Sequence, residues 1–194
     1  MVGILTKRKI IERIKKGMID NPADECLAPC SYELRVGSYG IPDTSDHVDL
    51  KVDETIAIAP HSFVLLGTLE EIKLDRDIVG LIYLRSSYAR NGLMPWFQGI
   101  IDPGYEGGLT ICLHNATNNL VPIKGGERMC HLIFHELSEK TDEYTGVYTK
   151  SKGATSSMYN KPIKIIGSEV ASNIIASGIG KGIGKVVGAA VLGV

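Results

Sequence analysis

Residues Gly99-Ile100-Ile101-Asp102-Pro103-Gly104-Tyr105-Glu106-Gly107 form the stretch on which the fold assignment rests. Pro103 and Gly104 are typical of a tight turn, and apolar runs lie on both sides of them. A hairpin built in this way would carry one carboxylate, Asp102, and one aromatic ring, Tyr105, toward a common pocket. The same residues also suit an ordinary hairpin with no chemical role, so the rest of the chain must decide.

Short β-rich runs separated by turn residues surround this hairpin, from residue 31 to about residue 140. The predicted strands are Tyr32–Val36, Thr55–Ala59, Phe63–Thr68, Ile78–Leu84, Leu109–Asn115 and Met129–Glu136. Many short strands at close spacing favour a sandwich or a barrel. The sequence therefore predicts an all-β fold, either a sandwich or a barrel, after one short N-terminal helix.

One short helix is predicted before the strands. Ile10, Ile11 and Ile14 recur at helical spacing. Thr6 is a suitable N-cap, and Gly17 is a suitable stop. We interpret this segment as a packing helix.

The chain changes in character after Tyr144. Residues 148–157 are small and polar, so we expect a mobile lid or disorder there. Residues 174–194 are apolar, with a glycine at every fourth position over 180–188, which suits close helix packing, a membrane or a partner helix. A disordered tail is the equally weighted alternative. We expect one domain over residues 1–160 and a glycine-rich apolar extension over 161–194.

Composition limits the partners. The net charge is -1, from 21 Lys and Arg against 22 Asp and Glu, so no overall field draws the chain to nucleic acid or anionic lipid. The four cysteines follow no secretory signal, so a cytoplasmic location is expected. Cys26 and Cys30 have zinc-like spacing, but Cys112 and Cys130 lie in apolar runs, which makes a zinc site the less favoured reading.

Two segments gather cations and hydroxyl groups that suit a phosphate ligand. Guanidinium groups bind phosphate in bidentate fashion, and hydroxyl or backbone N–H groups at a turn add neutral donors. The candidate donors are Arg85, Ser86, Ser87 and Arg90 in the first segment and Arg128 and His131 in the second. Arg128 is equally suited to a structural ion pair.

In their order and intervals, these segments resemble the signature motifs of the dUTPase and dCTP deaminase superfamily. Residues 99–107 fit the dUTPase pattern G-x-I-D-x-x-Y-x-G without a mismatch. Residues 5–17 and 29–37 resemble the opening helix and first motif in their deaminase form, and residues 148–157 resemble the C-terminal motif that closes over the nucleotide. The resemblance covers about residues 5–159. It implies a distorted β-barrel of jelly-roll type, the dUTPase-like β-clip, and a homotrimer with active sites shared between subunits.

The resemblance also implies roles. Asp102 would be the catalytic base that orients water, and Tyr105 would pack under the deoxyribose. Mg²⁺ on the triphosphate would neutralise charge during hydrolysis between the α- and β-phosphates, with Glu33 contacting the metal through water. The substrate-binding positions would be Arg85, Ser86, Ser87, Arg90, Gly99, Ile101, Tyr105, Arg128 and His131. The expected activity is hydrolysis of dUTP to dUMP and pyrophosphate.

Several departures from the family pattern bear on this activity. Cys112 stands where the deaminase branch has a catalytic glutamate, and a thiol with an unperturbed pKa of about 8.5 has one protonatable site. Glu33 replaces the usual aspartate, and His131 replaces the usual glutamine while keeping a hydrogen-bond donor.

Two alternatives therefore stay open at this point. One is a dCTP deaminase, or a bifunctional dCTP deaminase and dUTPase, which the presence of Arg90 favours. The other is a non-catalytic binding or structural protein that uses its C-terminal tail.

Overall fold

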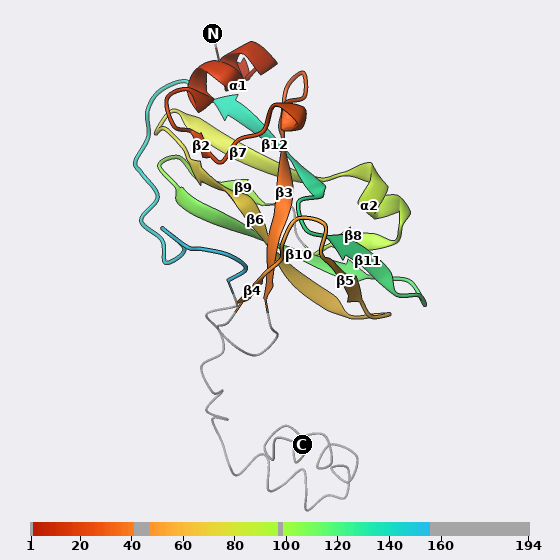
Figure 1. Ribbon diagram of the computed structural model, residues 1–194. Helices are drawn as coiled ribbons and strands as arrows, with labels where there is room; N and C mark the ends of the chain where they lie inside the picture. The colour runs from red at the N-terminus through yellow and green to blue at the C-terminus, as the bar shows by residue number, and fades with distance from the viewer. Residues whose placement is uncertain (1, 41–46, 97–98, 156–194) are drawn as a thin grey trace, which may run out of the picture. The chain divides into compact units, whose positions relative to one another are not determined.

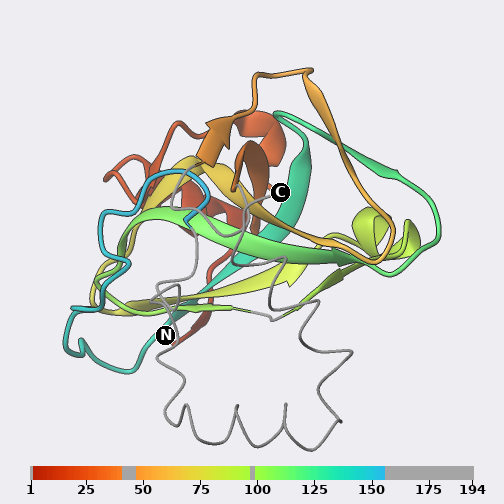
Figure 2. The same ribbon diagram turned by 90° about the horizontal axis from the view of Figure 1, so that it is seen from below.

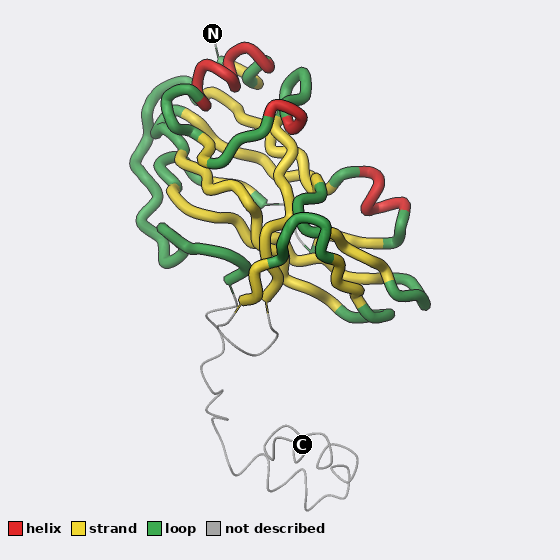
Figure 3. The backbone as a smooth tube through the Cα atoms, viewed as in Figure 1, coloured by secondary structure: helices red, strands yellow, loops and turns green. Residues whose placement is uncertain are grey.

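The computed structural model describes residues 2–40, 47–96 and 99–155 (Figure 1). Strands dominate this part of the chain (Figure 3). In chain order, the elements are β1 Gly3–Ile4, α1 Lys7–Ile14, β2 Ile19–Asp20, a 3₁₀ turn Asp24–Cys26, β3 Tyr32–Gly40, β4 His47–Asp49, β5 Thr55–Ile58, β6 Phe63–Lys73, β7 Ile78–Leu84, α2 Ser86–Arg90, β8 Leu93–Pro95, β9 Ile100–Ile101, β10 Glu106–Asn115, β11 Val121–Lys124 and β12 Arg128–Glu136.

The strands pair antiparallel in the order β8-β10-β6-β3-β12-β7-β9, with β1, β2 and β4 added to this path. Strands β5 and β11 form a separate two-stranded ribbon. The long sheet curls round a buried core (Figure 2), so the all-β fold expected from the sequence is confirmed. The two strands at the ends of this order, β8 and β9, are consecutive in the sequence.

All six predicted strands are present, four of them longer than the apolar pattern indicated. Strand β6 runs five residues beyond Thr68, to Lys73, and β10 begins at Glu106 rather than Leu109. Both differences have one reason, because Glu106↔Lys73 and Gly108↔Glu71 pair across the two strands in a polar stretch with no apolar alternation.

The predicted N-terminal helix is confirmed as α1. Thr6 is its N-cap, Ile10 is fully buried, and Gly17 adopts a φ of 90°, which a residue with a Cβ rarely tolerates. One turn further along the same side of the helix, Arg13 pairs with Asp77 (3.2 Å) and with Glu136 (3.4 Å). These ion pairs attach the helix to the start of β7 and the end of β12.

A buried ion pair crosses the core between β3 and β6. Glu70 is fully buried and accepts hydrogen bonds from Arg35 Nε (2.7 Å) and from the Arg35 backbone N–H (2.9 Å). The Tyr32 hydroxyl also donates to Glu70, at 3.3 Å. A buried carboxylate needs these partners, since an unpaired charge in the core is strongly destabilising.

Contacts group residues 1–157 as one compact unit. The expected extension over 161–194, with its contact through 174–194, lies outside the described residues and stays a prediction. None of the helices in the described ranges is long and apolar enough to cross a membrane.

Candidate functional site

The turn between β9 and β10 carries Asp102. The Tyr105 backbone N–H donates to the Asp102 carbonyl at 3.1 Å, which closes the turn predicted at Pro103 and Gly104. Gly104 has a φ of 76°, and a Cβ there would lie 2.5 Å from Glu143 Cβ, so glycine is required. The Asp102 side chain is exposed.

Tyr105 lies on the same hairpin but is buried, with 7% of its surface exposed. Its hydroxyl donates to the Gly108 carbonyl at 2.6 Å and lies 3.1 Å from Ser151 Oγ. Its ring packs against Tyr144, with the ring centroids 5.5 Å apart. Burial raises the pKa of Tyr105, so the hydroxyl stays protonated and acts as a fixed structural donor.

Residues 144–155 form a strap across this hairpin, although we expected a mobile lid or disorder after Tyr144. Tyr144 N–H donates to the Pro103 carbonyl (2.8 Å), Lys150 N–H to the Glu106 carbonyl (2.7 Å), and Gly108 N–H to the Ser151 carbonyl (2.8 Å). At its far end, Ala154 is fully buried. As the polar composition indicated, residues 144–155 form no helix or strand. Backbone hydrogen bonds to the hairpin order the strap instead.

A second group of side chains, the cation cluster, comprises Glu33, Arg85, Arg128 and His131. Glu33 Oε1 forms an ion pair with Arg85, 2.9 Å from its Nε, and Glu33 Oε2 accepts a hydrogen bond from Arg128 Nη1 at 2.6 Å. His131 Nδ1 lies 3.8 Å from Glu33 Oε1 and 3.3 Å from Ser31 Oγ. Strand register produces the cluster, because His131 pairs with Glu33 on β3 and with Tyr83 on β7.

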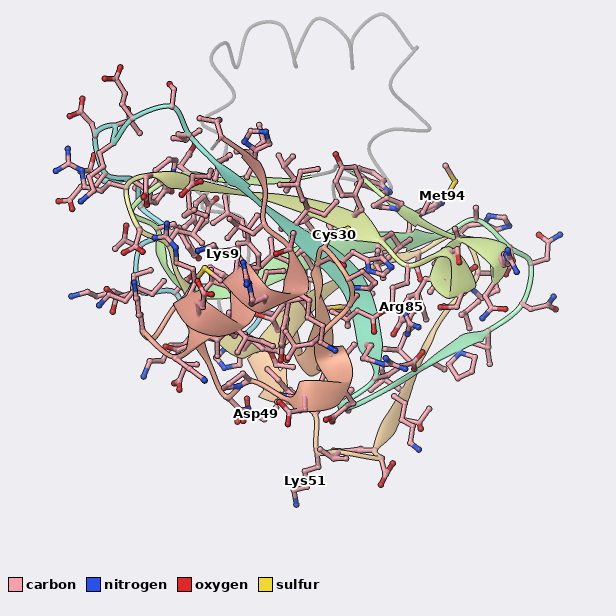
Figure 4. All side chains as sticks on the ribbon, turned by 90° about the horizontal axis from the view of Figure 1, so that it is seen from above. Lys9, Cys30, Asp49, Lys51, Arg85 and Met94 are labelled. Atoms are coloured by element: carbon pink, nitrogen blue, oxygen red, sulfur yellow. The ribbon has the colours of Figure 1, made fainter. Side chains whose placement is uncertain are left out.

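The other predicted phosphate donors lie beside this cluster on α2, which begins directly after Arg85 (Figure 4). Ser86, Ser87 and Arg90 are exposed, while Tyr88 is buried and anchors the short helix to the core. The structure thus brings the Arg-Ser-Ser segment and the Arg128 segment together.

Gly99 and Ile101 have a different position. The Gly99 carbonyl accepts from Ile82 N–H at 3.0 Å, and Ile101 is 3% exposed and pairs with Gly80. Within the described chain, their contacts are those of the β7–β9 pairing.

Within a single chain, Asp102 lies far from the cation cluster. Ile101 pairs with Gly80, and Arg85 lies five residues farther along β7. At about 3.4 Å per residue, the Asp102 backbone and Arg85 are about 17 Å or more apart. The two halves of the candidate site therefore lie at opposite ends of the same strand.

Cys112 lies half-buried on β10, opposite Leu65 of β6. Burial raises the pKa of its thiol, so the group is neutral near pH 7. Within residues 2–40, 47–96 and 99–155, no three His, Cys, Asp or Glu side chains are grouped as metal ligands.

The surroundings of Glu33 do not fit the expected contact with the water shell of Mg²⁺. Both of its carboxylate oxygens are already paired with guanidinium groups, and only 9% of the side chain is exposed. Two cations next to the carboxylate disfavour a third, divalent one.

Sequence reasoning missed an exposed aromatic surface, defined by Phe63, Met94, Trp96 and His114. Trp96 is 66% exposed, and its ring centroid lies 5.9 Å from that of Phe63 and 6.0 Å from that of His114. Register places Phe63 and Met94 on either side of His114. Met94 extends away from the ribbon (Figure 4). A signal was available in the alternation of Thr110, Cys112 and His114 with buried residues along β10.

Comparisons with known proteins agree with this fold. Residues 4–137 match the model of the dCTP deaminase-like family. The chain is 34% identical to the dCTP deaminase of Pyrococcus horikoshii over 155 residues, covering 79% of this chain and 96% of the relative. It is 37% identical to a probable deoxyuridine 5′-triphosphate nucleotidohydrolase of Sulfolobus islandicus rod-shaped virus 1, covering 78% of this chain and 96% of the relative.

A crystal structure of 2′-deoxycytidine 5′-triphosphate deaminase from Agrobacterium tumefaciens has the same fold, with a TM-score of 0.61 and 18% identity over 70% of this chain and 49% of that chain. The family match covers more than half of the chain. This protein therefore belongs to the dCTP deaminase-like family, within the dUTPase and dCTP deaminase superfamily that the motifs indicated.

Proposed function

We propose that this protein is a dUTP pyrophosphatase that hydrolyses dUTP to dUMP and pyrophosphate. The observation that carries the proposal is Cys112, which stands where deamination needs a carboxylate. Its thiol is half-buried and protonated near neutral pH, so it cannot take a proton from water as a carboxylate does. Its register partner on β6 is Leu65, and on the other side the Trp96 backbone N–H donates to the Cys112 carbonyl at 3.2 Å, so neither neighbour supplies a carboxylate.

Hydrolysis needs fewer groups, and the chain has them. In this proposal, the exposed Asp102 carboxylate takes a proton from water, and the water oxygen attacks the α-phosphorus. The bond from the α-phosphorus to the α–β bridging oxygen breaks, and that oxygen leaves with pyrophosphate. Arg85, Arg128 and Ser86 bind the phosphate oxygens.

Mg²⁺ belongs to this proposal as part of the substrate, the Mg²⁺ complex of dUTP. When bound to the triphosphate, the metal neutralises charge on the phosphate oxygens. We assign no residue of this chain to hold it, since the one expected carboxylate, Glu33, is paired with Arg85 and Arg128.

The proposed active site is shared between subunits of a homotrimer, because Asp102 and Arg85 lie at opposite ends of β7 in one chain. Exposed apolar side chains on two different parts of the surface support this assembly. The aromatic surface lies on β6, β8 and β10, while Ile100 (67% exposed) and Tyr83 (38% exposed) lie on β9 and β7. Two unlike surfaces suit head-to-tail association into a closed ring.

A direct assay tests the function. The purified protein is incubated with dUTP and, separately, with dCTP in the presence of Mg²⁺, and pyrophosphate and ammonia are measured. We expect pyrophosphate from dUTP and no ammonia from dCTP. Ammonia from dCTP would reverse the order of the two activities.

The second candidate is a dCTP deaminase, or a bifunctional deaminase and dUTPase. Similarity to known proteins favours it, since the relative from Pyrococcus horikoshii is a dCTP deaminase. Arg90, which the deaminase branch also uses, is exposed on α2. The same two measurements separate this candidate from the first, because only deamination releases ammonia.

A further inference from the structure

Glu33 lies at the centre of the cation cluster, where the family resemblance leads one to expect a carboxylate that serves a metal. We propose instead that Glu33 is a positioning residue, which holds Arg85 and Arg128 in the arrangement that binds the phosphate groups of the substrate. The inference rests on the proposed function only in taking a polyphosphate as the ligand.

The contacts divide the carboxylate evenly between the two arginines. Oε1 lies 2.9 Å from Arg85 Nε in an ion pair, and Oε2 accepts a hydrogen bond from Arg128 Nη1 at 2.6 Å. Arg85 Nη1 also donates to the Arg128 carbonyl, at 3.0 Å. Arg85 follows β7 and Arg128 begins β12, so Glu33 on β3 connects the guanidinium groups of two separate strands.

The charges around Glu33 favour an anion over a metal ion. Two guanidinium groups against one carboxylate leave the cluster positive, and His131 lies 3.8 Å from the same carboxylate. A divalent cation placed beside Glu33 would be repelled by both arginines, whereas a phosphate chain would be attracted. The carboxylate is also 9% exposed, while the arginine side chains are 26% and 40% exposed, so a ligand meets the arginines first.

Ordering the arginines before binding is the physical role of Glu33 in this arrangement. Arginine side chains have many rotamers, and a ligand that must order them binds more weakly. Glu33 fixes the orientation of each guanidinium plane, through Nε of Arg85 and Nη1 of Arg128. Because a guanidinium group is planar and rigid, the directions of its other N–H groups are then fixed as well.

The test measures binding of inorganic tripolyphosphate to the full-length chain. Binding of this ligand requires neither a catalytic base nor hydrolysis. Affinity is measured by isothermal titration calorimetry, with EDTA in one series and Mg²⁺ in the other. Glu33→Gln keeps the size of the side chain but turns an NH₂ group toward a guanidinium. We expect affinity in EDTA to fall about tenfold, as the loss of a charge-assisted contact implies. With dUTP, KM should rise about tenfold while kcat stays within about threefold.

Glu136→Gln is the matched control, because Glu136 also accepts from an arginine, Arg13, at 3.4 Å and lies outside the cluster. Its affinity for tripolyphosphate should equal that of the unchanged protein. Thermal unfolding shows whether each variant is folded. If Glu33→Gln does not fold, Arg85→Lys replaces it, since lysine keeps the charge but lacks the fork that reaches both Glu33 and a ligand. Its affinity should also fall about tenfold.

Three results would overturn the inference. Affinity that is unchanged or tighter in the folded variant would leave Glu33 as a counter-charge. A loss confined to the Mg²⁺ series would restore the metal role. If the wild-type protein does not bind tripolyphosphate, the cation cluster is not a polyphosphate site. By contrast, a wild-type protein that binds tripolyphosphate without hydrolysing dUTP would contradict the proposed function alone.

Discussion

Asp102 is the single residue on which the proposed hydrolysis depends most. Its carboxylate lies on the exposed side of the β9–β10 turn, while Tyr105 of the same turn is buried under the strap. The hairpin thus carries an exposed carboxylate and a buried ring, whose hydroxyl is hydrogen-bonded to Gly108 and Ser151. A change at Asp102 should therefore affect the chemistry more than the fold.

We expect Asp102→Asn to lower kcat for dUTP by at least about a hundredfold, the scale of a general base. Affinity for a non-hydrolysable dUTP analogue should change by less than about threefold, because the carboxylate is assigned to water activation. Asp142→Asn is the control, since Asp142 is also exposed and lies in a loop. Wild-type turnover by the Asp102 variant would remove its assigned role.

At the scale of elements, α1 depends on one arginine. Arg13 pairs with Asp77 and Glu136, and although burial alone would raise the pKa of Asp77, its hydrogen bond with Arg13 lowers it overall. A carboxyl group with a lowered pKa in the folded state stabilises the fold above its unfolded pKa. That stabilisation is lost as the pH falls through the lower, folded-state pKa. The helix attachment is therefore sensitive to acid.

Arg13→Gln should lower Tm at pH 7 by roughly 2–4 °C, the effect of losing about 1 kcal/mol in a domain of this size. The difference from the unchanged protein should begin to shrink below about pH 4, the ordinary pKa of an aspartate, and should continue to shrink as the pH falls through the lowered pKa of Asp77 in the folded state. Thermal unfolding at pH 7 and pH 3 measures this. Arg8→Gln, at an exposed pair with Glu12, should leave Tm unchanged. A Tm difference that is equal at both pH values would contradict the linkage to Asp77.

At the scale of the whole molecule, the candidate site is incomplete in one chain. Asp102 and the cation cluster are separated along β7, and exposed apolar side chains lie near each half. A ring of identical subunits would join the Asp102 end of one chain to the Arg85 end of the next. The proposal of a shared site therefore makes a prediction about mixtures.

Asp102→Asn and Arg85→Gln should each be inactive toward dUTP on their own. When the two variants are unfolded together, refolded and mixed evenly, about a quarter of the sites in random rings would combine an intact Asp102 with an intact Arg85. Size-exclusion chromatography with light scattering gives the oligomeric state, and pyrophosphate release gives the activity. Mixed trimers without any recovered activity would show that each site lies within one chain.

Local sequence patterns were enough to predict the individual elements. Helical spacing of isoleucines predicted α1, apolar runs predicted six strands, and Pro103 with Gly104 predicted the turn that carries Asp102, because each of these signals spans only a few neighbouring residues. Which side chains from different elements meet depends on the tertiary structure. Glu33 meets Arg85 and Arg128 through the register of β3, β12 and β7, and the strap covers Tyr105 through backbone hydrogen bonds. Contacts between distant strands depend on register and curling, which no local pattern encodes.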